Sequence, residues 1–142
     1  MKRTSKEFFE QYHTARWNFT GTYDERVEKE HQMFMDWWNE LEVGDHAHIQ
    51  HYSDVSPVTV IKRTAKTITV RYDKAESDPN WKPEFEVGGF SAHCTNNDEQ
   101  KWIITEDPNG RTDTFRLRKC GWRNSADEKL FPEWAKHYDY NF

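Results

Sequence analysis

The first 42 residues have the spacing of two amphipathic helices. Apolar side chains recur every three or four positions in two stripes, the first made of Phe8, Tyr12, Ala15 and Phe19 and the second of Val27, Phe34, Trp37, Trp38 and Leu41. Thr4-x-x-Glu7 and Thr22-x-x-Glu25 each have capping-box spacing, which marks a helix start. Because Thr20-Gly21 suits a helix end and leaves a short connection, the pattern predicts an antiparallel helical hairpin over residues 4–42.

From residue 43 onward the apolar positions alternate with polar ones, as is typical of β-strands. Ala47 and Ile49 alternate with His46, His48 and Gln50 in a first strand. Two runs rich in β-branched residues follow over 58–63 and 67–73. The three-residue connection between these runs predicts a β-hairpin.

The next region predicts a loop and three further strands. In order, these are a loop over 74–83, a strand over 85–94, a strand over 102–105 and a strand over 112–118. Gly88-Gly89 is expected to bend the long strand. Asp107-Pro108-Asn109-Gly110 suits a type I turn. The last two strands are therefore expected to form a hairpin.

The C-terminal segment, residues 119–142, is polar but rich in aromatic rings. Its rings are Trp122, Phe131, Trp134, Tyr138, Tyr140 and Phe142. Since each ring can bury ~150–250 Å², the tail is expected to pack back on the strands. We therefore predict a single domain of the α+β class. A helical hairpin (4–42) packs on a five- or six-stranded antiparallel β-barrel (43–118) that is followed by an aromatic tail (119–142).

Composition predicts a folded, soluble domain. The 142 residues include seven Trp, six Tyr and nine Phe, so rings carry the core in place of leucines. The sequence contains no run of about 18 apolar residues, so no membrane span is expected. The N-terminus lacks the pattern of a signal peptide. A cytoplasmic location is therefore expected, with Cys94 and Cys120 as reduced thiols.

Charge is concentrated in one segment. Residues 74–110 contain eight carboxylates and three lysines and so carry −5, which equals the net charge of the whole chain. Such a segment complements a cationic surface on another protein. Trp81, in a polar loop at the edge of the segment, is expected to be an exposed anchor. The predicted partner-binding residues are Trp81, Glu84, Glu86, Asp98 and Glu99.

Basic residues offer an alternative. Lys62, Arg63, Lys66 and Arg71 flank the central hairpin, and a basic stripe with nearby rings can follow a nucleic-acid backbone. The net charge of −5 excludes a strongly basic, duplex-coating protein. This alternative is therefore a nucleic-acid-binding module with one modest contact face.

Candidate chemistry for catalysis is sparse. His46 and His48 share one face of a strand and are able to ligate a metal ion, with His93 or Cys94 as further ligands. A zinc site needs at least three convergent ligands, so we expect no metal and no cofactor. No nucleophile or phosphate-binding motif is present. The sequence favours a non-catalytic protein, with a metal-dependent enzyme as the third alternative.

Two resemblances bear on function. A strand after Val43-Gly44-Asp45 and the hairpin over 58–72 resemble the start of an SH3-like barrel of the KOW or Tudor kind. The stretches 60–70 and 88–102 resemble uncharacterised small proteins of phages and conjugative elements. Such elements carry inhibitors of host defence, including anti-CRISPR proteins. The resemblance implies an inhibitor that docks on a host protein, such as a nucleic-acid-handling defence effector.

Overall fold

The N-terminal region is a helical hairpin, as the sequence predicts. In the computed structural model, which describes residues 3–88 and 91–139, helix α1 spans Ser5–Trp17 and α2 spans Tyr23–Trp38. The capping box of Thr4 and Glu7 forms in both directions. At α2 the Thr22 hydroxyl accepts a hydrogen bond from the amide of Glu25. These caps satisfy amides that have no partner within the first helical turn.

The two helices pack through their rings. Phe8 is fully buried and stacks on Trp37, with ring centroids 4.3 Å apart. Residues that flank the helices add polar contacts: the guanidinium of Arg3 donates to both carboxylate oxygens of Glu40, and the indole N–H of Trp37 donates to the carbonyl of Arg3. The chain start is thus held against the end of α2.

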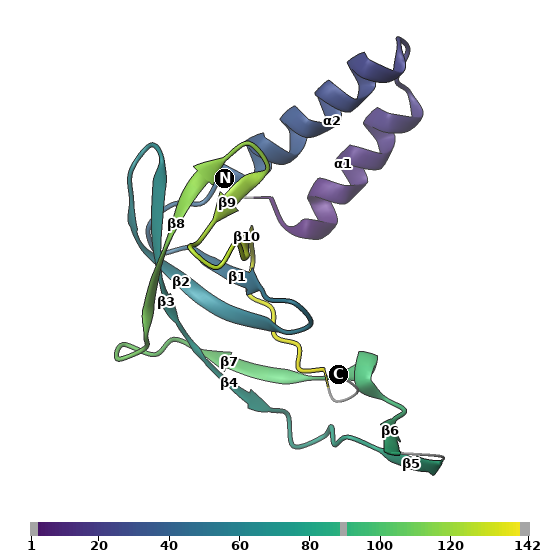
Figure 1. Cartoon of the computed structure of the whole chain (residues 1–142), viewed down its shortest axis with the longest axis vertical. Coiled ribbons are helices and arrows are strands. Elements are labelled where there is room, and N and C mark those ends of the chain that lie inside the picture. Colours follow the sequence, from purple (N-terminus) through teal and green to yellow (C-terminus); the bar gives the residue numbers. More distant parts are fainter. Residues whose placement is uncertain (1–2, 89–90, 140–142) are drawn as a thin grey trace.

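The main body is a closed antiparallel β-barrel of six described strands. They are β1 (His46–Gln50), β2 (Val55–Arg63), β3 (Thr67–Tyr72), β8 (Thr112–Arg118), β9 (Gly121–Arg123) and β10 (Lys129–Pro132). They pair in the order β1-β2-β3-β8-β9-β10, and β10 returns to β1. Each strand therefore pairs with the next barrel strand along the chain. The predicted α+β class and barrel are confirmed (Figure 1).

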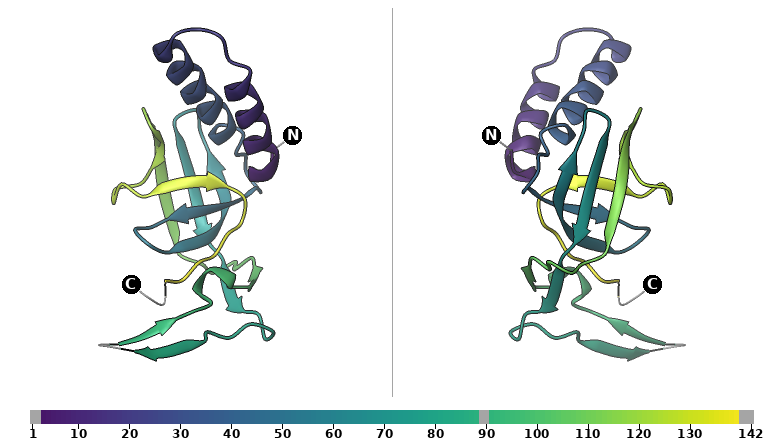
Figure 2. Two further views of the ribbon diagram at one scale, coloured as in Figure 1. Left: turned by 90° about the vertical axis from the view of Figure 1, so that its right-hand side faces the viewer. Right: turned by 90° about the vertical axis from the view of Figure 1, so that its left-hand side faces the viewer.

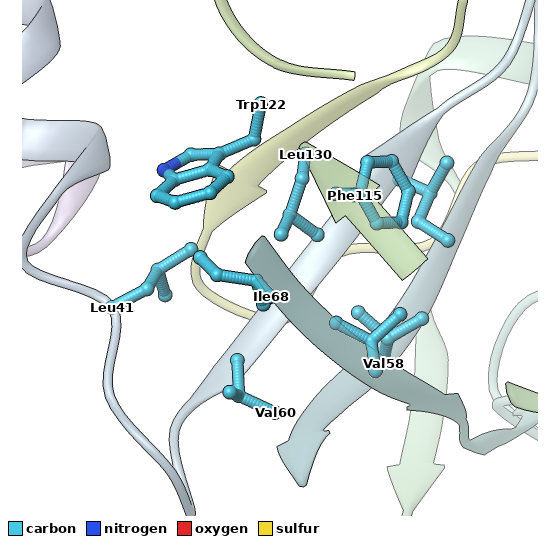
Figure 3. Packing of buried hydrophobic residues seen from close by; sticks show 10 residues of the cluster. Leu41, Val58, Val60, Ile68, Phe115, Trp122 and Leu130 are labelled. Atoms are coloured by element: carbon cyan, nitrogen blue, oxygen red, sulfur yellow. The ribbon is translucent and has the colours of Figure 1, made fainter. Parts of the chain in front are cut away.

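The barrel interior is filled by alternating apolar side chains. Every barrel strand contributes to this core, and Leu41, just after α2, is part of it; seven of these side chains are labelled in Figure 3. The largest side chains are Trp122 and Phe115, each at most 1% exposed. Burying side chains of this kind stabilises the folded state by about 1.5–3 kcal/mol each.

The tail is part of the barrel, which corrects the predicted division at residue 118. Strands β9 and β10 both lie beyond that residue, and β10 closes the barrel by pairing Phe131 with His48 on β1. The prediction that the rings pack back is confirmed for Trp122, which is buried in the core. Tyr140 and Phe142 lie outside the described residues.

A further unit of paired strands projects from the barrel between β3 and β8. It contains β4 (Lys74–Ser77), β5 (Phe85–Gly88), β6 (Ser91–Cys94), the 3₁₀ turn η1 (Asn97–Glu99) and β7 (Trp102–Thr105). We call residues 74–105 the β arm. It lies at the end of the barrel opposite the helical hairpin (Figures 1 and 2).

The β arm is one long hairpin with an irregular middle. Lys74 pairs with Thr105, and eleven residues further along both strands Phe85 pairs with Cys94, so the β4–β7 and β5–β6 ladders share one register. Backbone bonds from Asp78 to Lys101 and from Thr95 to Glu84 flank the irregular segments.

Three predictions for this region were wrong. Part of the expected loop over 74–83 is strand β4, and the expected single strand over 85–94 is a hairpin. Strand 102–105 pairs with β4, whereas 112–118 pairs with β3 and β9, so these two do not form a hairpin together. The expected bend at Gly88-Gly89 falls partly outside the described residues. The turn at Asp107–Gly110 is confirmed by the bond from the Gly110 amide to the Asp107 carbonyl.

The helical hairpin and the barrel meet at Trp122. Its indole N–H donates to the carbonyl of Trp38 at the end of α2. On the same ring, the Arg63 guanidinium lies 5.3 Å from the ring centroid and donates to the carbonyls of Asn39 and Leu41. Gly121 has φ +105°, and a Cβ atom there would lie 2.8 Å from the Trp38 ring. Trp38 can therefore contact the barrel only because residue 121 lacks a side chain.

Neither described helix has the length and apolar content that a membrane crossing requires.

Replacement of Gly121 by Ala should lower the free energy of unfolding through two effects. The positive φ costs about 1–3 kcal/mol, and overpacking against Trp38 adds about 1–3 kcal/mol. Gly44→Ala is the matched control, since Gly44 has φ +93° but a Cβ atom there would meet nothing within 4 Å. Urea denaturation should show the larger loss for Gly121→Ala. An equal loss of unfolding free energy in Gly121→Ala and Gly44→Ala would contradict close packing between residue 121 and the Trp38 ring.

Candidate partner-binding surface

The β arm carries most of the predicted acidic segment on a projecting unit. Its charged residues are six carboxylates (Glu76, Asp78, Glu84, Glu86, Asp98 and Glu99) and three lysines (Lys74, Lys82 and Lys101), a net charge of −3. The four carboxylates predicted to bind a partner, those at 84, 86, 98 and 99, are all exposed. The tertiary structure therefore places them together on one ribbon.

The other two carboxylates of the segment lie where the arm meets the barrel. The Glu106 carboxylate is 3.7 Å from the His46 imidazole. Asp107 stabilises the turn, because its carboxylate accepts from the amide of Asn109 at 3.0 Å. These two side chains serve the connection to the barrel, so the acidic surface is smaller than the sequence segment of −5 suggests.

The Trp81 side chain is buried, which corrects its expected exposure. Its side chain is 7% exposed, and Cys94 in the same arm is 1% exposed. A buried indole contributes to the stability of the arm, so Trp81 is not an exposed anchor. The sequence signal was misleading because Asp78, Pro79 and Asn80 precede the ring and resemble a solvated loop.

Asn96 is an organising residue that the sequence analysis missed. Its side-chain amide donates to the carbonyl of Lys82 at 2.7 Å, and its side-chain oxygen accepts from the amide of Glu84 at 2.8 Å. The Asn96 side chain thus takes the place of regular backbone hydrogen bonds between the two irregular segments of the arm. This contact determines where Glu84 lies relative to η1.

The C-terminal segment holds the arm against the barrel. Gln100 exchanges two hydrogen bonds with the backbone of Tyr138, one through its amide nitrogen and one through its oxygen. The Lys136 ammonium lies 5.6 Å from the centroid of the Trp102 ring. His137 forms a β-bridge with Val55 on β2. The arm is therefore joined to the barrel by the chain at its base and also through residues 136–138, which contact both the arm and β2.

Exposed apolar side chains accompany the charges. Phe85 is 52% exposed and Ile103 is 48% exposed. Both belong to strands of the arm, β5 and β7. The two side chains lie apart on the arm, because Ile103 pairs with Glu76 on β4 and Phe85 pairs with Cys94 nine residues further along the ribbon. Exposed apolar groups are common anchors in interfaces, and both have the exposure that Trp81 lacks.

The alternative basic set is only partly exposed. Lys62 and Lys66 are exposed, whereas Arg63 and Arg71 are half-buried. The Arg63 guanidinium is held by the backbone after α2 and by Trp122. Arg63 therefore has a structural role at the junction of helices and barrel, which differs from the predicted solvent-facing position.

The histidines predicted as metal ligands have other contacts. His46 stacks on Trp134 with centroids 3.5 Å apart, and the Nδ1 of His48 donates to the carbonyl of Glu133 at 2.8 Å. His93 and Cys94 belong to the arm. Within residues 3–88 and 91–139, no group of three or more His, Cys, Asp or Glu side chains is placed to hold a metal ion.

Comparison with protein-family models, with curated proteins and with solved structures finds no match to this chain. The resemblance to proteins of phages and conjugative elements therefore stays a prediction.

Trp81→Ala should destabilise the arm while the barrel stays folded. Removing a buried Trp side chain costs about 3–5 kcal/mol, and Trp81 belongs to the arm and not to the barrel core. Hydrogen exchange should become at least about tenfold faster at the amides of Asp78 and Thr95, a change of about 1.4 kcal/mol. The barrel amides of Val60 and Leu117 should change little. Phe85→Ala, at a half-exposed ring, is the control; unchanged exchange in Trp81→Ala would contradict a core role.

Stability should fall below pH about 6.5 because of His48. Burial lowers the pKa of its imidazole, whereas the unfolded chain titrates near 6.5. As pH decreases, the unfolded state therefore binds a proton before the folded state does, and the folded state loses stability. Urea midpoints at pH 7.5 and 5.5 should differ less in His48→Asn than in the wild type. The exposed-site variant His31→Asn should keep the wild-type difference; an unchanged difference in His48→Asn would contradict the assignment.

Proposed function

We propose that this protein is a non-catalytic binding protein that docks on a host protein through its acidic β arm. The observation that supports this most directly is the gathering of Glu84, Glu86, Asp98 and Glu99, all exposed, on a ribbon that projects away from the barrel. The complementary partner surface is cationic, such as the nucleic-acid-binding surface of a defence effector. The protein then acts as an inhibitor that occupies this surface.

Electrostatics supports a role for these carboxylates in association. A charged protrusion attracts a surface of opposite sign over roughly a Debye length, about 8 Å at physiological ionic strength. Such steering raises the association rate more than it raises the affinity. The three lysines of the arm offset half of its six carboxylates, so the charge that attracts a partner is the net −3 of the arm.

Exposed apolar side chains supply the short-range part of the proposed interface. Phe85 on β5, between Glu84 and Glu86 along the chain, and Ile103, opposite Glu76 on β4, replace Trp81 as anchors at two separate points of the arm, since both are about half exposed. A ring and a branched aliphatic side chain that lose water on binding slow dissociation. Trp81 then acts indirectly, by stabilising the arm that carries them.

The alternative, a nucleic-acid-binding module that uses Lys62, Arg63, Lys66 and Arg71, has less support. Arg63 donates to backbone carbonyls after α2, so its guanidinium is already engaged. Only the lysines of this set are exposed. Nuclease treatment separates the two functions, because it removes nucleic acid from the sample and leaves protein partners.

Charge reversal on the arm should slow association with a captured partner. Full-length protein captures proteins from a nuclease-treated host lysate, and the association rate of each purified candidate is then measured at low and high salt. The variant Glu84→Lys, Glu86→Lys, Asp98→Lys should associate at least about tenfold more slowly at low salt, and the difference should shrink as salt screens the charges.

The matched control reverses three exposed carboxylates of the helical hairpin, with Glu10→Lys, Asp24→Lys and Glu28→Lys. Its association rate should stay within about twofold of the wild type, since steering depends on charges close to the interface. Equal slowing in both variants, or none in the arm variant, would contradict the proposal. Capture that disappears after nuclease treatment would favour the nucleic-acid-binding module.

A further inference from the structure

A groove on the outer face of β8 and β9 gathers three arginines. Its volume is about 470 Å³, and its lining includes Thr112, Thr114, Arg116, Arg118, Arg123 and Ser125. None of these residues belongs to the arm or to the basic set around the β2–β3 hairpin. The groove thus lies apart from the acidic docking surface, and its size is within the range of small-ligand sites, about 300–1,000 Å³.

The strand register places like charges opposite each other. Arg116 on β8 pairs directly with Arg123 on β9. Arg118 lies two residues along β8, so its side chain extends from the same face as Arg116. Like charges directly opposite each other in an antiparallel pair are destabilising. An anion between them removes this repulsion.

The guanidinium groups of Arg116 and Arg118 are available for a ligand. Both side chains are exposed, and no carboxylate of the described residues forms an ion pair with either of them. Arg123 has a contact of its own: its Nη1 donates to the Asp127 carbonyl at 3.0 Å and lies 3.4 Å from the Asp127 carboxylate, which is 85% exposed. A ligand can therefore compete for this guanidinium as well.

The single acid of the lining is held by neutral groups. The Asp113 carboxylate accepts from the amide of Thr114 and from the side-chain amide of Asn124, each at 2.8 Å. It is thus turned toward the backbone and the β9–β10 turn. The Thr114 hydroxyl, 3.3 Å from that of Thr69, lies on the outer face and is an additional donor or acceptor.

We propose that this groove binds phosphate, carried by a nucleotide or by a single nucleic-acid strand. Planar guanidinium groups donate two parallel hydrogen bonds to a phosphate, a geometry that lysine cannot reproduce. Three such groups with neighbouring threonines match a multiply charged oxyanion better than a lone carboxylate. This site goes beyond the proposed docking function, because it lies on the barrel and recognises a different chemistry.

The test measures binding of three probes to the full chain at about 50 mM salt: inorganic phosphate, adenosine monophosphate and a fluorescent single-stranded oligonucleotide. Amide and arginine Nε–H resonances of Arg116, Arg118 and Arg123 should shift on titration. Arg116→Gln with Arg118→Gln should weaken binding at least about tenfold and reduce the salt slope by about 1–2. Replacing the same two residues by Lys should weaken binding less, since Lys keeps the positive charge but cannot donate two parallel hydrogen bonds to one phosphate.

The matched control, Lys6→Gln with Lys101→Gln, removes two exposed charges outside the groove and should bind within about twofold of the wild type. Similar binding of the monophosphate and the oligonucleotide, with mutual competition, identifies a nucleotide site. Much tighter binding of the oligonucleotide than of adenosine monophosphate identifies a site for a single nucleic-acid strand. The proposal is overturned if no probe shifts the groove resonances, or if the control loses as much binding as the arginine variant.

Discussion

The contact between Trp122 and the end of α2 is the interaction on which the arrangement of the molecule depends. The indole ring fills one end of the barrel and donates to the Trp38 carbonyl. Arg63 lies over the same ring and donates to the carbonyls that follow the helix. Gly121 permits this approach because a side chain there would collide with Trp38. Trp122 thus belongs both to the barrel core and to the contact that holds the helical hairpin.

The β arm shows how a marginal element becomes a stable platform. A two-stranded hairpin alone is at best weakly stable in water. This one has two buried side chains, Trp81 and Cys94, the hydrogen bonds of the Asn96 side chain across the ribbon, and a connection through Gln100 to the C-terminal segment. These contacts hold the exposed carboxylates in a defined arrangement.

Charge separation gives the molecule two chemically distinct surfaces. The arm is acidic, whereas the outer face of β8 and β9 presents Arg116, Arg118 and Arg123. The two surfaces belong to different pairs of strands, and the turn at Asp107–Gly110 separates them along the chain. The two surfaces therefore differ in the sign of their charge. The overall net charge of −5 describes neither of them.

The sequence alone determined the elements that depend on short spacings. The capped helices, the hairpin of β2 and β3, the turn at Asp107–Gly110 and the alternation over 112–118 all follow from contacts within a few residues. It also showed that acidic residues are concentrated between residues 74 and 110, because charge is read directly from residue identity. The tertiary structure decided which strands pair: β10 closes on β1, and β4 pairs with β7. It likewise decided that Trp81 is buried and that Arg63 caps a helix. These outcomes depend on segments tens of residues apart, whose meeting is determined by the closure of the barrel and by the shared register of the arm, and local sequence patterns carry no information on either.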